Sequence, residues 1–113
     1  MRIGLLLVAP ALLLGGCAST QLYNWGNYEE DLFTYYNEPG EQAEVVADHV
    51  AFLDKIMARG EKPAPGLLAE AGTFYLQAGN TDKALEYYQL EYDTWPESRA
   101  LMSSLINNLG GAQ

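Results

Sequence analysis

Residues 67–96 read LLAEAGTFYLQAGNTDKALEYYQLEYDTWP, and this stretch decides the fold of the chain. Gly79 divides it into two segments of helical character, and Pro96 ends the second because proline cannot continue a helix. Gly72 and Ala84 are small enough to let two helix backbones approach closely, while large side chains fill the space around them. The stretch therefore predicts an antiparallel helical hairpin with these packing residues: Leu68, Gly72, Tyr75, Ala84, Tyr88 and Pro96.

The spacing of these packing residues resembles the tetratricopeptide repeat, a 34-residue unit of two helices. Counted from Gly72, they follow one another at steps of 3, 9, 4 and 8 residues, as in that repeat, and the resemblance covers residues 65–98. Two positions depart from the pattern. Ala71 stands where the repeat prefers Leu, and Glu91 stands where a small residue usually packs. We therefore expect the end of this hairpin to be looser than in the family.

In tetratricopeptide proteins the first helix of each unit lines a concave face that binds a partner. The matching positions here are all uncharged, which disfavours recognition of a peptide carboxylate: Gly66, Ala69, Thr73, Leu76 and Gln77. The resemblance makes Thr73 and Gln77 the candidate partner-binding residues of this face. A plain solvated surface is the alternative.

Apolar residues at helical spacing continue on both sides of the hairpin. They predict helices over residues 27–37 and 41–59 before it and over residues 98–109 after it, and no segment alternates as a strand does. The fold class expected is all-α, built of short antiparallel helical hairpins. Along the chain this gives a degenerate helical hairpin (23–64), the tetratricopeptide-like hairpin with a C-terminal capping helix (65–109) and a disordered tail (110–113).

The aromatic residues are concentrated near the start of the first predicted helix. Six of the 13 aromatic side chains lie between residues 23 and 36. Trp25 precedes that helix and Phe33 lies off its apolar stripe, so both are candidate anchors for a protein partner. Core packing is the alternative, because a small helical domain must fill its interior with large side chains.

The same region carries the segment Tyr-Asn-Trp-Gly at residues 23–26. Around this segment the chain is similar to a family of small Gram-negative outer-membrane lipoproteins of unknown function. Proteins of that kind are found beside lipoproteins similar to the curli secretion channel. The resemblance implies another envelope protein as partner, such as a curli-channel-like lipoprotein, and it implies no activity.

The first residues of the chain carry a targeting pattern. Arg2 precedes an apolar run over residues 3–14, which as a helix spans about 18 Å, against about 30 Å for a hydrocarbon core. This pattern predicts a secretory signal peptide over residues 1–16. The following Gly15-Gly16-Cys17 resembles the lipobox of bacterial lipoproteins, which implies cleavage between Gly16 and Cys17 and lipidation of Cys17. An ordinary secreted protein with one unpaired or buried Cys is the alternative.

Residues 17–22 would then form a lipidated tether, and the lipid would be the chain's contact with the membrane. In bacterial lipoproteins an Asp after the lipidated Cys often retains the protein at the inner membrane. Ala18 stands there instead. The resemblance thus implies an outer-membrane lipoprotein that faces the periplasm.

Composition narrows the chemistry that is expected. The 113 residues include 15 acidic and 6 basic side chains, a net charge of -9, which disfavours nucleic acid as a partner. The single His, His49, and the single Cys give no multi-ligand metal site, so we expect no metal and no cofactor. The sequence favours a non-enzymatic adaptor between proteins. A cell-wall-acting enzyme and a purely structural envelope lipoprotein are the alternatives.

The substitution Cys17→Ser tests the anchor. It removes the thiol that carries the lipid, so cells expressing it should no longer incorporate a clickable fatty acid into this protein. Ser19→Ala is the matched control two residues further on and should keep the label. Retention of the label in Cys17→Ser would contradict lipidation at this residue.

Overall fold

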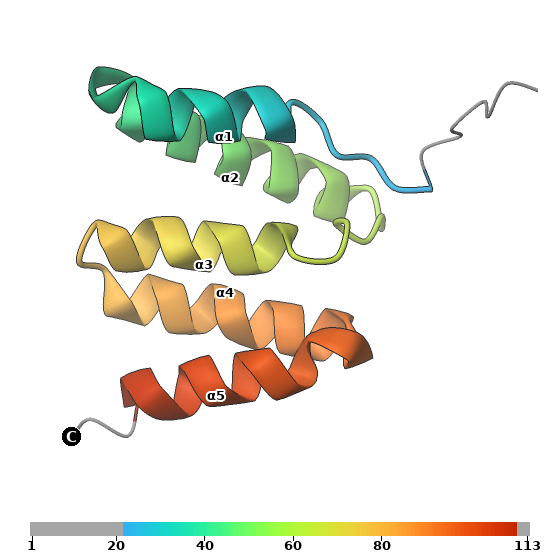
Figure 1. Cartoon of the computed structure of the whole chain (residues 1–113). Helices are drawn as coiled ribbons and strands as arrows, with labels where there is room; N and C mark the ends of the chain where they lie inside the picture. Colours follow the sequence, from blue (N-terminus) through green and yellow to red (C-terminus); the bar gives the residue numbers. More distant parts are fainter. Residues whose placement is uncertain (1–21, 111–113) are drawn as a thin grey trace, which may run out of the picture.

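The computed structural model describes residues 22–110 and confirms the all-α fold of helical hairpins over that range (Figure 1). Its elements are α1 (Tyr28–Asn37), the 3-10 turn η1 (Pro39–Glu41), α2 (Gln42–Ala58), α3 (Leu67–Gln77), α4 (Thr81–Thr94), the 3-10 turn η2 (Pro96–Ser98) and α5 (Arg99–Gly110). Within residues 22–110, no helix combines the length and the apolar character needed to cross a bilayer.

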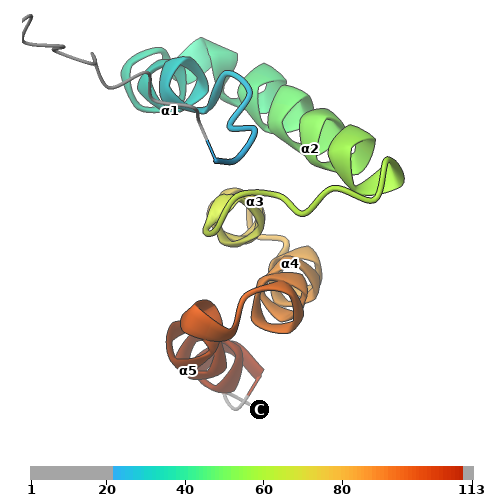
Figure 2. The same ribbon diagram turned by 90° about the vertical axis from the view of Figure 1, so that its right-hand side faces the viewer.

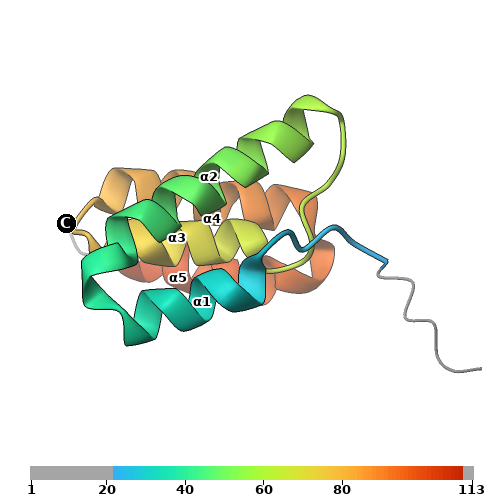
Figure 3. The ribbon, with the colours of Figure 1, turned by 90° about the horizontal axis from the view of Figure 1, so that it is seen from above.

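The helices stack in the order in which they occur in the chain (Figure 1). Viewed from the side in Figure 2, α1, α3 and α5 lie on one side of the stack, and α2 and α4 lie on the other. Figure 3 shows that α2 crosses the stack obliquely, whereas the other four helices run nearly along one direction. The second half of α2 therefore diverges from α1 and leaves a wedge that the N-terminal segment fills.

Some expected boundaries shift when the chain is folded. The second helix begins after a 3-10 turn over Pro39–Glu41, because the fixed φ of proline suits that turn. Gly110 is the last residue of α5, so its assignment to a disordered tail was wrong. The expected signal peptide, Gly16, Cys17 and residues 111–113 lie outside the described residues.

The α3–α4 hairpin packs at Gly72. A Cβ atom built on Gly72 would lie 2.7 Å from the ring of Tyr88 and 3.1 Å from the carbonyl oxygen of Ala84, so only glycine fits. Tyr88 is buried there, and its hydroxyl forms a 2.9 Å hydrogen bond with the Oγ1 atom of Thr73. Leu68 and Ala84 are fully buried. Each residue expected to pack the middle of the hairpin is thus at its centre.

Two further expected packing residues lie at the edges of the hairpin. Tyr75 is half-buried and stacks on Tyr87 of α4, with ring centroids 5.5 Å apart. Pro96 is exposed and starts η2, directly after α4 has ended at Thr94. The last helix, α5, covers the open side of α4 through Met102, which is buried against the cluster of Ala84 and Tyr88.

Glu91 tightens the hairpin, contrary to the expectation that it would loosen it. Its side chain is 0% exposed, and its Oε1 atom accepts a 2.6 Å hydrogen bond from the backbone N–H of Gly66, the N-cap residue of α3. Gly66 has φ 95° and carries no side chain that could cap the helix itself. An oxygen acceptor at a helix N-terminus is favourable because the first N–H groups lack partners within the helix. Glu91 therefore caps α3 from α4.

The N-terminal segment, residues 22–27, fills the wedge beside α2. Tyr23 and Trp25 pack against the core formed by residues of α2, α3 and α4. Gly26 has φ 57°, and a Cβ atom on it would lie 2.9 Å from the ring of Phe52. The segment can lie this close to α2 because glycine adopts a positive φ and leaves room for that ring.

Gly72→Ala should destabilise the domain. Helix propensity alone favours Ala by about 0.5–1 kcal/mol, but overpacking against Tyr88 and the Ala84 backbone costs about 1–3 kcal/mol. We expect a lower free energy of unfolding in urea and a melting temperature lower by several degrees. Gly40→Ala is the matched control, because nothing lies within 4 Å of its added Cβ atom. A Gly72→Ala variant more stable than wild type would contradict the close helix contact.

Glu91→Gln should change stability in a pH-dependent way. Burial raises the pKa of the Glu91 carboxyl above its usual value, although the nearby backbone N–H groups of Gly66 and Ala69 partly oppose this. The folded state then binds the proton more tightly than the unfolded chain does. The stabilising contribution of Glu91 is complete below the pKa of the unfolded chain, and it is lost as the pH rises through the folded pKa.

The variant stays uncharged at every pH. Its free energy of unfolding relative to wild type should therefore rise with increasing pH, as measured by urea denaturation at a series of pH values. Glu61→Gln is the matched control, because it removes one exposed charge that is not among those acting on the Glu91 carboxyl. A stability difference between Glu91→Gln and wild type that is the same at all pH values would contradict the burial of an ionisable carboxyl at this position.

Candidate functional site

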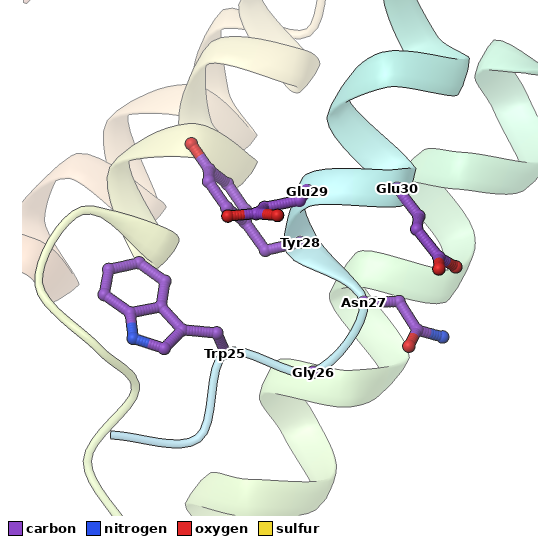
Figure 4. A pocket seen from close by; sticks show the side chains of 6 residues that line it. All are labelled: Trp25, Gly26, Asn27, Tyr28, Glu29 and Glu30. Atoms are coloured by element: carbon purple, nitrogen blue, oxygen red, sulfur yellow. The ribbon is translucent and has the colours of Figure 1, made fainter. Parts of the chain in front are cut away.

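Two cavities lie around the N-terminal segment and the start of α1. One of about 490 Å³ is lined by consecutive residues: Trp25, Gly26, Asn27, Tyr28, Glu29 and Glu30 (Figure 4). The other, of about 180 Å³, lies between this segment and α2 and has these lining residues: Trp25, Gly26, Asn27, Tyr28, Asp31, Asp48, His49 and Phe52. Because the two share four lining residues, we call them together the N-terminal pocket.

Two local hydrogen bonds fix the backbone of this segment and so determine where its side chains point. The Asn24 Oδ1 atom accepts a 3.1 Å hydrogen bond from the Gly26 N–H, and the Tyr28 N–H donates to the Trp25 carbonyl at 3.2 Å as α1 begins. In Figure 4, Trp25 and Tyr28 project to the side that faces α3, while Asn27 and Glu30 project to the opposite side. Consecutive residues therefore contribute both aromatic walls and polar walls to the pocket.

Aromatic rings make up the inner wall. The rings of Trp25 and Tyr28 have centroids 5.8 Å apart, and the Tyr28 ring lies 6.4 Å from the imidazole of His49. Phe52 of α2 is half-buried beneath Gly26. Three aromatic side chains, Trp25 of the N-terminal segment, Tyr28 of α1 and Phe52 of α2, thus line one small cavity.

His49 forms a buried floor of the pocket. Its side chain is 3% exposed, and its Nε2–H donates a 2.9 Å hydrogen bond to the carbonyl oxygen of Leu67 in the first turn of α3. Burial lowers the pKa of His49, although this hydrogen bond and the charge of Asp31 partly oppose the shift. The imidazole therefore joins α2 to α3 through one buried hydrogen bond.

The carboxyl groups near the pocket lack cationic partners. Burial and the neighbouring charge of Asp48 raise the pKa of the half-buried Asp31, although His49 partly opposes this. On α3, burial raises the pKa of Glu70, whose Oε1 atom is buried without a hydrogen-bond partner. Residues 22–54 contain eight acidic side chains and no Lys or Arg. The arrangement is suited to a ligand that carries positive charge.

The two aromatic candidates of the sequence differ in exposure. Phe33 is 64% exposed on α1, and Tyr36, one turn further along, is 60% exposed. Trp25 is half-buried against the core and contributes a wall of the pocket.

The groove candidates Thr73 and Gln77 already make intramolecular hydrogen bonds. The Thr73 hydroxyl also donates to the carbonyl of Ala69 at 3.1 Å, in addition to its contact with Tyr88. The Gln77 Oε1 atom accepts a hydrogen bond from the hydroxyl of Tyr35, which joins α1 to the end of α3. Gln77 also lines a cavity of about 530 Å³ at the α1–α2 corner. These two side chains lie away from the N-terminal pocket.

The pocket contains residues that the sequence did not single out as a site. Tyr28 and Asp31 come from α1, and Asp48 and Phe52 come from α2, so their proximity depends on the angle between the helices. The one signal in the sequence was the absence of basic residues through a stretch rich in acidic and aromatic side chains. Among residues 22–110, no group of three or more His, Cys, Asp or Glu is arranged to hold a metal ion.

Fold and pocket define a small domain of stacked helical hairpins with an aromatic and acidic pocket at its N-terminal segment. The chain belongs to the DUF4810 family, a domain of unknown function, and the match spans residues 22–105. It starts at the first described residue and includes the pocket, α1 to α4 and half of α5. No curated protein and no solved structure matches the chain.

Proposed function

We propose that the protein is a non-enzymatic adaptor, lipid-anchored at the outer membrane and facing the periplasm, that docks another envelope protein. The signal-peptide pattern and the lipobox-like Gly16-Cys17 support the location. The likeness to small Gram-negative lipoproteins supports a partner such as a curli-channel-like lipoprotein in secretion or envelope assembly. The tetratricopeptide-like spacing, with its buried Gly72 and Tyr88, supports a scaffold for protein binding.

One observation carries the proposal. Phe33 and Tyr36 lie three residues apart on α1 and are both mostly exposed to solvent. Neighbouring exposed aromatic side chains on one helix face are costly in water and are favoured as anchors in protein interfaces. Acidic residues at the start of the same helix, Glu29 and Glu30, add charge that directs which partner can approach.

Photocrosslinking in intact cells tests the docking surface. A photoreactive phenylalanine analogue at position 33 should form a specific adduct with one envelope protein, identified by mass spectrometry. The same analogue at Leu101 is the matched control, because Leu101 is 63% exposed but lies on α5 at the other end of the stack. Phe33→Ala should weaken co-purification of that partner by about 1 kcal/mol or more, which is at least about fivefold.

The controls separate this role from others. Circular dichroism melts show whether Phe33→Ala remains folded, as expected for an exposed side chain. Equal adducts from positions 33 and 101 would indicate nonspecific contact and contradict a docking surface on α1. An adduct with a cytoplasmic protein would contradict the envelope location.

A further inference from the structure

We propose that the N-terminal pocket binds the ammonium group of a lysine side chain presented by the docking partner. This inference rests on the proposed adaptor function and names the chemistry of the partner. It starts from a mismatch within the molecule, since three aromatic rings and two carboxylates line the 180 Å³ cavity and no Lys or Arg occurs within residues 22–54.

The aromatic walls suit an organic cation. The faces of Trp25, Tyr28 and Phe52 carry partial negative charge, which attracts a cation placed within about 6 Å of the ring centroid. The chain makes such contacts elsewhere. Lys62 lies 5.5 Å from the ring of Trp95, and Arg99 lies 5.3 Å from the ring of Tyr92. Both of these contacts use basic residues of the second half of the chain. Neither involves a ring of the N-terminal pocket, so a cation that contacts those rings would come from another molecule.

Two carboxylates add full negative charge to the weak attraction that the aromatic rings exert on a cation. Asp31 on α1 and the exposed Asp48 on α2 line the same cavity, and the negative charge of Asp48 helps to raise the pKa of Asp31. A cation between them would convert this repulsion into two attractions. His49 beneath them directs its Nε2–H to the carbonyl oxygen of Leu67, so that donor does not bind either carboxylate. Two carboxylates beside three rings offer few ligands to a metal ion but accommodate an ammonium group on a methylene stem.

The exposed acidic residues of the larger cavity favour an ammonium group from a lysine side chain over one from a lipid headgroup. Ethanolamine lipid headgroups also carry one, but they join it to a phosphate. Glu29 and Glu30, which line the larger cavity outside, are both exposed and would repel that phosphate. A lysine side chain brings no anion with it, so the pocket favours a basic segment of a protein.

NMR titration of the full chain in nonionic detergent micelles tests the inference. The probes are N-acetyl-lysine methylamide, the uncharged N-acetyl-norleucine methylamide and phosphoethanolamine, observed at the side-chain resonances of Trp25 and Tyr28. The lysine probe should give saturable shifts that weaken with added salt, and the other two should bind at least tenfold more weakly. Equal binding of the norleucine probe overturns a cation site, and equal binding of phosphoethanolamine overturns the choice of lysine.

Variants locate the binding. The double variant Asp31→Asn with Asp48→Asn should weaken the lysine probe at least tenfold, and its melting temperature should not fall because the replaced pair is repulsive. Asp54→Asn is the matched control, since Asp54 is exposed on α2 outside the pocket and should change the affinity less than twofold. Equal weakening in both would mean diffuse attraction to an acidic protein and would overturn the inference.

The same variants separate this inference from the adaptor function. The double variant is compared with wild type by crosslinking at position 33. If the adduct forms to the same extent, the pocket does not bind the partner's lysine, which overturns this inference but leaves the adaptor function intact. Lysine-probe binding without any position-33 adduct in cells would remove the adaptor function and leave the ammonium site standing. Loss of the position-33 adduct in the double variant, with the adduct kept in Asp54→Asn, supports both.

Discussion

The first turn of α3 is held from both sides, and the rest of the structure depends on it. Glu91 of α4 accepts the N–H of Gly66, and His49 of α2 donates to the carbonyl of Leu67 one residue later. Both hydrogen bonds are buried or partly buried, where an unpaired polar group would be costly. The two hairpins therefore meet at adjacent residues of one helix start, and the wedge that holds the N-terminal pocket opens beside this junction.

The hairpin of α3 and α4 could be predicted from the sequence because its packing rules are local. Gly72 and Tyr88 must face each other at a helix crossing, and their spacing alone indicates it. The role of Glu91 could not be predicted in the same way. A charged residue at a position for small side chains looked unfavourable in the sequence. The N–H that its Oε1 atom accepts belongs to Gly66, which is 25 residues away and has a positive φ, and its Oε2 atom is buried without a hydrogen-bond partner.

The aromatic character of the N-terminal region could be predicted from the sequence, but the pocket within it could not. Phe33 is exposed, as its place off the helix stripe indicated. Trp25 precedes the helix, so no periodicity fixes where its ring lies. Its position follows from the oblique path of α2, which periodicity within one helix does not encode. The pairing of Asp31 with Asp48 across two helices depends on that same angle.

The close packing of the N-terminal segment against the core limits the distance between the domain and a lipid anchor at Cys17. Tyr23 lies with its ring centroid 5.4 Å from that of Trp95, near the junction of the hairpins, and Trp25 is held beside Phe52. With a lipid anchor at Cys17, only eight peptide units separate the anchored residue from Trp25, a span of at most roughly 29 Å. The pocket would then stay within that radius of the bilayer surface, and the domain could capture only partners that place a basic segment in the same thin layer.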